Sequence, residues 1–131
     1  MKKFFRYILP GILILLILTS CSGGSSTDEA AVAVEGYFQA LVDRDLNGFT
    51  NITCLAWEEQ AHLEFDSFSA VSTKVEDLNC QVTNSEGDYA VVECQGIITA
   101  NYGDEDQEFN LAGNHYQAFF EDGEWRMCGY H

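Results

Sequence analysis

Five cysteines and three histidines are the side chains of this 131-residue sequence that most readily act as metal ligands, nucleophiles or bases. The cysteines include no Cys-x-x-Cys pair of the kind that thiolate zinc sites use. The run Asp104-x-Asp106-x-Glu108 has the alternating carboxylates that begin a calcium-binding loop, but glycine is missing at its sixth position and glutamate at its twelfth. The sequence therefore predicts an acidic turn there, and it predicts neither a metal nor another cofactor.

The first 20 residues have the composition of a secretory signal. Three of the six basic residues lie before position 7, and an apolar run of about 11 residues follows from Ile8 to Leu18. That run is short for a membrane span, which needs about 20 residues. The sequence Leu18-Thr19-Ser20-Cys21 closely resembles the lipobox of bacterial lipoproteins. The resemblance implies cleavage before Cys21 and a diacylglyceryl group on its sulfur, with residues 1–20 as the signal peptide. The alternative is an ordinary signal peptide in which the cysteine is incidental.

Charge limits the partners and the means of attachment. The sequence has 6 basic and 21 acidic residues, and its net charge of −15 excludes DNA and RNA as expected partners, because phosphate binding needs clustered Lys and Arg. Cleavage before Cys21 leaves three basic and 21 acidic residues, a net charge of −18. Such a chain is not attracted to anionic lipid, so the acyl chains on Cys21 are the expected anchor. The acidity is typical of a solvated surface, and a saline habitat or weak cation binding would explain it as well.

Residues 21–27 are predicted to be the lipidated cysteine and a flexible tether, because they contain Ser22-Gly23-Gly24-Ser25-Ser26. The expected location is the cell membrane or the outer membrane, with the domain outside the cytoplasm.

Four cysteines remain once Cys21 is lipidated, and an even number in a small exported domain predicts two disulfides with three possible pairings. Cys80 and Cys94 flank a turn-rich cluster, residues 84–88. Pairing the flanking strands about Gly87 places Cys80 opposite Cys94 and puts one set of apolar residues on one face. This register favours Cys80–Cys94, which leaves Cys54–Cys128. Exported disulfides also argue against a cysteine nucleophile.

Apolar spacing predicts helices in the first half of residues 28–131. A helix is expected over residues 27–44, because Val34, Tyr37, Phe38, Leu41 and Val42 share one helical face. Ser26 and Glu29 have the spacing of a capping box at its start. Residues 45–48 are expected to end this helix and cap a short second one through Ile52. A further helical segment is expected from about residue 55 to residue 65.

From Thr73 the period of the apolar residues becomes two, which predicts strands over residues 73–83, 89–102, 107–120 and 125–130. The parity of the third strand switches at Gly113-Asn114, which indicates a bulge, and Gly96 is expected to bend the second strand similarly. Residues 121–124 are expected to form a hairpin turn. The fold class predicted for residues 28–131 is therefore α+β, with N-terminal helices packed on a curved antiparallel four-stranded sheet.

Two stretches resemble parts of nuclear transport factor 2-like domains. Residues 35–41 followed by Arg44-Asp45-Leu46 resemble the opening helix and the start of the second helix, and residues 119–127 resemble the closing hairpin. The resemblance covers about residues 27–131 and implies a cone-shaped fold, an architecture that cystatin-like domains and small lipoproteins share. The four cysteines are not part of the general family pattern, and they indicate a specialised exported branch.

The resemblance implies a cavity but not one function, because the fold hosts isomerases, dehydratases, cyclases and non-catalytic binding modules. In its enzymes an Asp or His in the cone, often with a Tyr, handles protons. His62 and His115 fit a position on the surface as well as one in the cavity. His131 is expected to be disordered. The residues expected to line a cavity are Trp57, His62, Tyr102, His115, Tyr116 and Trp125.

Two classes of function remain. The favoured one is a membrane-tethered, non-catalytic binding or accessory module, whose partners are the membrane through Cys21 and a small molecule or an envelope protein. The alternative is a small-molecule enzyme of the isomerase or cyclase type that uses the cone. No residue pair has a known catalytic spacing, and the carboxylates cluster in turns and on helix faces, so no catalytic residue is predicted.

Overall fold

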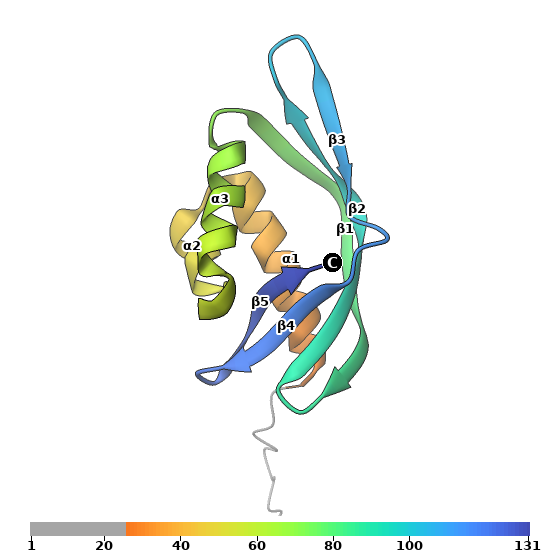
Figure 1. The fold of residues 1–131 in the computed structure, drawn as a ribbon. Helices are drawn as coiled ribbons and strands as arrows, with labels where there is room; N and C mark the ends of the chain where they lie inside the picture. Colours follow the sequence, from red (N-terminus) through yellow and green to blue (C-terminus); the bar gives the residue numbers. More distant parts are fainter. Residues whose placement is uncertain (1–25) are drawn as a thin grey trace, which may run out of the picture.

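The computed structural model describes residues 26–131, so the predicted signal peptide, Cys21 and most of the tether lie outside the described residues. Helices α1 (Asp28–Asp43), α2 (Leu46–Asn51) and α3 (Glu58–Ser69) pack on one face of a curved antiparallel sheet (Figure 1). The strands are β1 (Ser72–Glu86), β2 (Tyr89–Asn101), β3 (Asp106–Asn110), β4 (Tyr116–Glu121) and β5 (Glu124–Tyr130). This α+β arrangement is the predicted fold class. Within residues 26–131, no helix is long and apolar enough to cross a membrane.

Helix α1 forms where the apolar spacing predicts it and turns its apolar face to the sheet. Tyr37, Phe38 and Leu41 are each no more than 2% exposed. The predicted capping box is not formed, because the Ser26 hydroxyl accepts from the Asp28 N–H at 3.2 Å, and the Glu29 N–H donates to the Ser26 carbonyl instead. The helix ends at a residue in the left-handed conformation, Arg44, whose N–H donates to carbonyls of the last turn.

Helices α2 and α3 follow after short connections. The Asp45 carboxylate accepts from the Gly48 N–H at 3.0 Å, which confirms the predicted cap of α2. Helix α3 continues beyond the predicted end near residue 65 and stops at Ser69. The reason is Phe68, which extends the buried face of Ala61 and Phe65 by one more turn and packs against the sheet.

The sheet has five strands, one more than predicted, in the order β1-β2-β4-β5 with β3 also paired to β2. One edge of β2 pairs with β1, and its other edge pairs with β3 at residues 97–101 and with β4 at residues 89–92. The predicted strand over residues 107–120 is therefore divided. Residues 111–115 leave the ladder, where the Leu111 N–H donates to the Gly96 carbonyl at 3.0 Å and Gly113 has a φ of 88°.

The bend expected at Gly96 is present, and the extra residue lies on the neighbouring strand β1. The register of β1 against β2 shifts between Glu76 and Asn79, where Asp77 has a φ of 55°. Gly96 itself has a φ of 130°, and a Cβ there would lie 3.0 Å from both the Glu76 carbonyl oxygen and the Leu78 Cα. Only glycine allows the two backbones to approach this closely at the bulge.

Both disulfides have the pairing that the strand register favours. Cys80 lies opposite Cys94 in the β1–β2 ladder, and the structure contains the Cys80–Cys94 and Cys54–Cys128 bonds. The second bond joins the segment after α2 to β5, where the Cys54 N–H donates to the Met127 carbonyl at 2.9 Å. That segment covers part of the β5 edge. On the opposite edge of the sheet, the Glu35 carboxylate accepts from the Cys80 N–H at 2.7 Å. These contacts protect edges that would otherwise pair with another strand.

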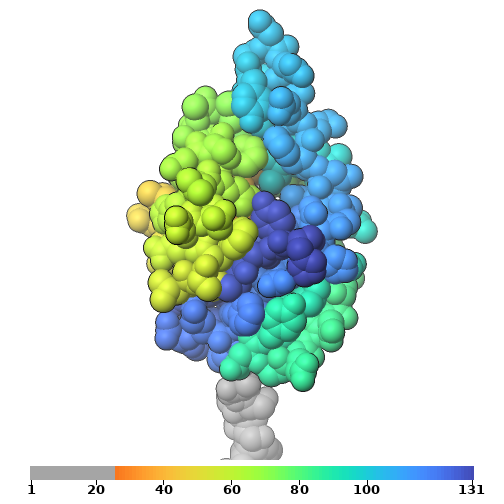
Figure 2. Space-filling view, viewed as in Figure 1, coloured from red at the N-terminus to blue at the C-terminus, as the bar shows by residue number. Residues whose placement is uncertain are grey.

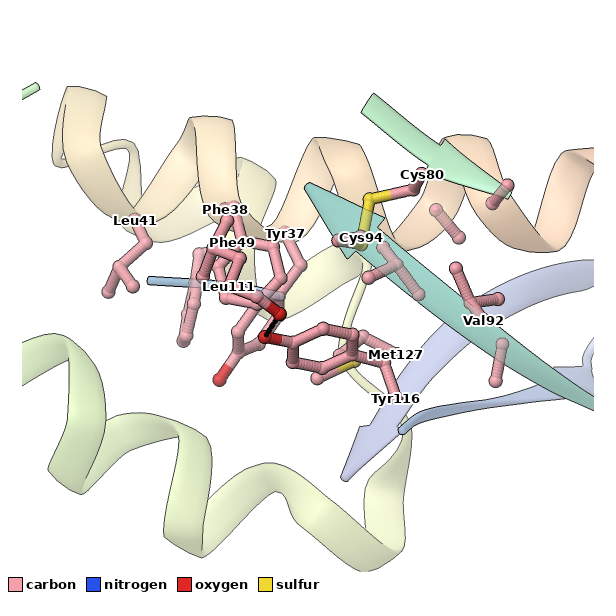
Figure 3. Close-up of a cluster of buried hydrophobic side chains, with 14 of the residues drawn as sticks. Tyr37, Phe38, Leu41, Phe49, Cys80, Val92, Cys94, Leu111, Tyr116 and Met127 are labelled. Carbon is pink, nitrogen blue, oxygen red and sulfur yellow. Dashed lines mark hydrogen bonds between the residues drawn. A yellow bond between two sulfur atoms is a disulfide. The ribbon is translucent and has the colours of Figure 1, made fainter. Parts of the chain in front are cut away.

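The core lies between α1 and the sheet and is strongly aromatic (Figure 3). Tyr37 of α1 and Phe49 of α2 are fully buried, with ring centroids 4.4 Å apart. Phe49 also contacts Phe65 of α3, at 5.0 Å between centroids. These rings therefore hold the three helices together and fix the position of α3 relative to the strands.

Candidate functional site

A cavity of about 410 Å³ lies between α3 and the sheet. Figure 2 shows the molecular surface hollowed where α3 faces β3 and the end of β5. Cavities of this size hold small organic molecules. The wall contains ten residues from both helices and strands: Phe38, Glu64, Ser67, Phe68, Ile98, Tyr102, Phe109, Leu111, Tyr116 and Tyr130.

Aromatic side chains make up most of this wall. Phe68 of α3 and Phe109 of β3 are in edge-to-face contact, with centroids 5.4 Å apart and nearly perpendicular ring planes. Tyr116 has similar neighbours, because Phe38 lies 5.1 Å and Tyr130 lies 5.7 Å from its centroid. Edge-to-face contacts of this kind are favourable and keep the rings in fixed positions. The wall is therefore an ordered aromatic surface.

Glu64 is the carboxylate of the cavity wall, and α3 directs it inward. It lies three residues after Ala61 and four before Phe68, both of which are buried. Its Oε2 accepts a hydrogen bond of 2.9 Å from the Tyr37 hydroxyl. Burial raises the pKa of Glu64 because it disfavours the charged form, while the hydrogen bond from Tyr37 opposes that rise. No basic residue is among the described residues that line the cavity.

Tyr37 supports Glu64 from below, on the buried side of the cavity. Its side chain is fully buried, and burial together with the nearby Glu64 charge raises the pKa of Tyr37 well above its usual range. The phenol therefore stays protonated and donates a hydrogen bond to the carboxylate. Trp57 packs at the same end of the fold, with its ring 5.7 Å from that of Tyr130, and its buried Nε1 has no hydrogen-bond partner among the described residues.

Tyr116 is buried, lines the cavity, and has a hydroxyl with a structural role. The hydroxyl donates to the Leu111 carbonyl at 3.0 Å (Figure 3). It accepts from the Asn114 side chain at 3.3 Å. Burial raises the pKa of Tyr116, so this phenol also stays protonated. Because its hydrogen bonds hold the segment that divides β3 from β4, Tyr116 offers a ligand its ring more readily than its hydroxyl.

Two of the six residues expected to line a cavity line this one, namely Tyr102 and Tyr116. Tyr102 and Tyr130 are 46% and 43% exposed, which places them at the mouth. Trp57 lies outside the wall and packs on Gly129 and Tyr130. Trp125 packs on Phe120 near the β4–β5 turn. Both tryptophans are therefore packing residues at the edges of the helix–sheet interface.

The internal histidines lie away from the cavity. His62 is on the outer side of α3, where its Nε2 is 3.9 Å from the Glu58 carboxylate. His115 lies 3.6 Å from the Glu93 carboxylate, and its ring stacks on that of His131. His131 was expected to be disordered, but it pairs with His115 through the backbone. Its N–H donates to the His115 carbonyl at 3.2 Å, and its carbonyl accepts from the His115 N–H at 3.1 Å. Backbone pairing with His115 thus extends one residue beyond the end of β5 at Tyr130.

The sequence interpretation missed Glu64, although a signal for it exists. Positions 61, 65 and 68 are apolar and share one face of α3, and position 64 belongs to the same face. A carboxylate at an inward position of an amphipathic helix is unusual. The predicted end of the helix near residue 65 concealed it, because Phe68 was not counted as part of the pattern.

The acidic run after β2 forms a turn, as predicted. The Tyr102 N–H donates to the Glu105 carbonyl at 2.8 Å, and the Asn101 side chain donates to Asp106 at 2.6 Å. Among residues 26–131, no group of three or more His, Cys, Asp or Glu side chains is arranged to hold a metal ion.

Comparison with known proteins identifies the fold. No protein-family model and no curated protein matches the chain. A SEC-C motif containing protein from Rhodopseudomonas palustris has a similar structure, with a TM-score of 0.52 and 12% identity over 79% of this chain and 80% of that chain. An LEH-like epoxide hydrolase from M. tuberculosis has a TM-score of 0.50 and 16% identity over 76% of this chain and 81% of that chain. The likeness to the second, which has the nuclear transport factor 2-like fold, agrees with the predicted fold class.

Proposed function

We propose that this protein is a lipid-anchored, exported binding domain that holds a small, mainly apolar molecule between α3 and the sheet. The observation that carries the proposal is the cavity of about 410 Å³, with its ordered aromatic wall and one inward carboxyl group. Binding pockets in proteins combine this apolar lining with few polar groups that fix the orientation of the ligand. Glu64 and the tyrosine hydroxyls at the mouth are the polar groups here.

The arrangement supports binding better than catalysis. A reaction that moves protons needs at least two polar groups that converge on the reacting atoms. The Tyr116 hydroxyl is engaged by Leu111 and Asn114, and the Tyr37 hydroxyl is engaged by Glu64. The histidines at positions 62 and 115 are outside the cavity wall. Tyr130 is the remaining phenol of the wall near Glu64, and it lies at the exposed mouth, away from the buried part of the cavity.

A second candidate function, a small-molecule isomerase or cyclase, is favoured by one observation. Glu64 is a carboxyl group whose pKa burial raises, and such groups serve as general acids or bases in enzymes. A turnover that Glu64→Gln abolishes, while ligand binding persists, would establish this reading in place of the binding module.

A substitution at Ser67 tests whether the cavity is the binding site. Ser67 and Ser69 are both exposed residues of α3, and each hydroxyl donates to the carbonyl three residues earlier. Ser67 lines the cavity and Ser69 does not. Ser67→Trp is expected to fill the cavity and weaken binding of 3,3-dimethyl-4-phenylbutan-1-ol, a neutral apolar probe, by about tenfold or more, since excluding the probe removes its apolar contacts. Isothermal titration calorimetry of the full chain in detergent measures the affinity.

Ser69→Trp is the matched control for that experiment. It adds the same indole to the same helix outside the wall, so its affinity for the probe is expected to equal that of the unmodified chain. Both variants meet the same detergent, so partition of the probe into micelles affects them equally. Equal binding by the two variants, or no binding by the unmodified chain, contradicts the proposed site.

The anchor is tested at Cys21. The full chain expressed in a bacterium is expected to lose residues 1–20, gain the mass of the diacylglyceryl group on Cys21 and sediment with membranes, because more than one acyl chain gives stable anchoring. Cys21→Ser is expected to leave the chain uncleaved or free of lipid, whereas Ser22→Ala is processed normally. Intact-protein mass spectrometry of the membrane and soluble fractions measures both. A Cys21→Ser chain that is cleaved and lipidated like the unmodified one would overturn the anchor.

A further inference from the structure

We propose that the ligand of this cavity is an organic cation, a quaternary ammonium or bulky amine whose charge lies among the aromatic rings beside Glu64. The inference rests on the proposed binding function and names the chemical class that the site selects. Three features carry it: the arrangement of the rings, the charge of the wall and the charge of the whole domain.

The rings surround the space from several directions. Phe68 comes from α3, Phe109 from β3, Tyr116 from β4 and Tyr130 from β5. Phe68 and Phe109 are in contact, with centroids 5.4 Å apart, and so are Tyr116 and Tyr130, at 5.7 Å. Each pair therefore forms a continuous aromatic surface on one part of the wall. Aromatic rings attract a cation within about 6 Å of their centroids, and cages of such rings recognise quaternary ammonium groups. A neutral apolar ligand would be held equally well by aliphatic side chains, which are few here.

The charges of the wall point the same way. Glu64 contributes a carboxylate, and none of the described lining residues is basic. The basic residues of the described chain are Arg44, Lys74 and Arg126. Lys74 and Arg126 are near glutamates of their own strands, Glu76 and Glu124. An anionic ligand would therefore enter the cavity without a counter-charge, whereas a cation meets one directly.

The charge of the domain extends this preference to longer range. Residues 26–131 contain 21 acidic and three basic side chains, so the domain as a whole has a strongly negative net charge. Such a charge raises the local concentration of cations and repels anions. A field of this sign would be a disadvantage for an acidic ligand and speeds the encounter with an organic cation.

The pH dependence of the binding affinity distinguishes a cation from a neutral ligand. The titratable groups that face Glu64 are tyrosines: Tyr37 from α1, Tyr116 from β4 and Tyr130 from β5. In the free protein, burial raises the pKa of Glu64, and a bound cation favours its ionised form. Cation affinity is therefore expected to fall as the pH drops below the raised pKa, by up to about tenfold per pH unit, and to level off above it.

The test compares two probes that differ in one atom. Benzyl(2-hydroxyethyl)dimethylammonium has nitrogen where 3,3-dimethyl-4-phenylbutan-1-ol has carbon, so their shapes match and their charges differ. Calorimetry with the full chain at pH 7.5 is expected to show about tenfold tighter binding of the cation, in line with desolvated cation–π and carboxylate contacts. Glu64→Gln is expected to lose this advantage, so that the affinities of the variant for the cation and the alcohol become about equal.

The outcomes separate the inference from the proposed function. If the alcohol binds as tightly as the cation to the unmodified chain and Ser67→Trp weakens it, the cation inference fails and the binding function stands. If neither probe distinguishes the unmodified chain from Ser67→Trp, both fail. If Glu64→Gln retains the cation advantage, the assignment of Glu64 fails. If Glu64→Gln does not bind the alcohol, the pH series decides: a cation affinity that does not fall on acidification relative to the alcohol overturns the inference.

Discussion

Replacing Cys54 and Cys128 together with alanine is expected to lower the free energy of unfolding by about 4.5 kcal/mol, the chain-entropy value for a closed loop of this length. The two residues are 74 positions apart, and their bond connects the segment after α2 to β5. Without it the unfolded chain gains the conformational freedom of the loop from Cys54 to Cys128. Because small domains are stable by only about 5–15 kcal/mol, the variant should be close to unfolding at physiological temperature.

The second disulfide supplies the matched control. Cys80 and Cys94 are 14 positions apart, so the Cys80→Ala, Cys94→Ala variant is expected to lose about 3 kcal/mol. Urea unfolding of both variants, followed by tryptophan fluorescence, measures the difference. A larger loss for the Cys80–Cys94 variant than for the Cys54–Cys128 variant would show that native packing, and not loop closure, determines the contribution of each bond.

Phe49→Ala is expected to cost about 3–5 kcal/mol, as large-to-small substitutions of buried aromatic residues do. The ring is fully buried and lies between Tyr37 of α1 and Phe65 of α3. Its loss leaves a cavity where the three helices meet. The same change should weaken ligand binding, because α3 carries Glu64 and Phe68 and depends on this contact for its position.

Phe119→Ala is the control for the same chemical change at the surface. Phe119 is 38% exposed and contacts Tyr89 on the neighbouring strand, so its removal is expected to cost about 1 kcal/mol or less. Thermal and urea unfolding give the two losses on one scale. Equal losses for the two variants would contradict the role of Phe49 as the residue that joins the helices.

Local patterns predicted most of the secondary structure and both disulfides. The pairing of Cys80 with Cys94 follows from the turn around Gly87 and the alternation of apolar residues on each side of it. The α1 helix follows from its 3.6-residue period, and the cap at Asp45 follows from its residue type. In each case the residues that decide the structure are close in sequence, so the pattern contains the necessary information.

The fifth strand could not be predicted in this way. The parity change near Gly113 indicated a break, but both halves of the expected strand pair with β2 at different places along its length. That choice depends on where β2 bends at Gly96 and on where the Tyr116 hydroxyl holds the Leu111 carbonyl. Gly96 marks the bend in the sequence, but the hydrogen bond of the Tyr116 hydroxyl has no signature there.

The candidate site was predicted least well, because residue type was given more weight than position. The histidines were considered for their chemistry, yet both internal ones lie on outer surfaces. Glu64 was not singled out from the sequence, although its place on the buried face of α3 distinguishes it from the other carboxylates. Its hydrogen bond to Tyr37 joins residues of two helices that are 27 positions apart in the sequence. This tertiary contact gives the carboxyl group its environment.

The way β3 is attached has a kinetic consequence. All five of its residues are exposed, and it pairs with β2 alone, beyond the end of the shared edge that β4 occupies. Segments with few buried contacts separate from a fold at a lower free energy than the core needs to unfold. Since β3 carries Phe109, such a local opening removes one wall of the cavity while α1, β2 and β4 stay in place. The opening of the hairpin formed by β2 and β3 would then set the rates of ligand entry and exit. The aromatic rings and the Glu64 carboxylate would set the affinity.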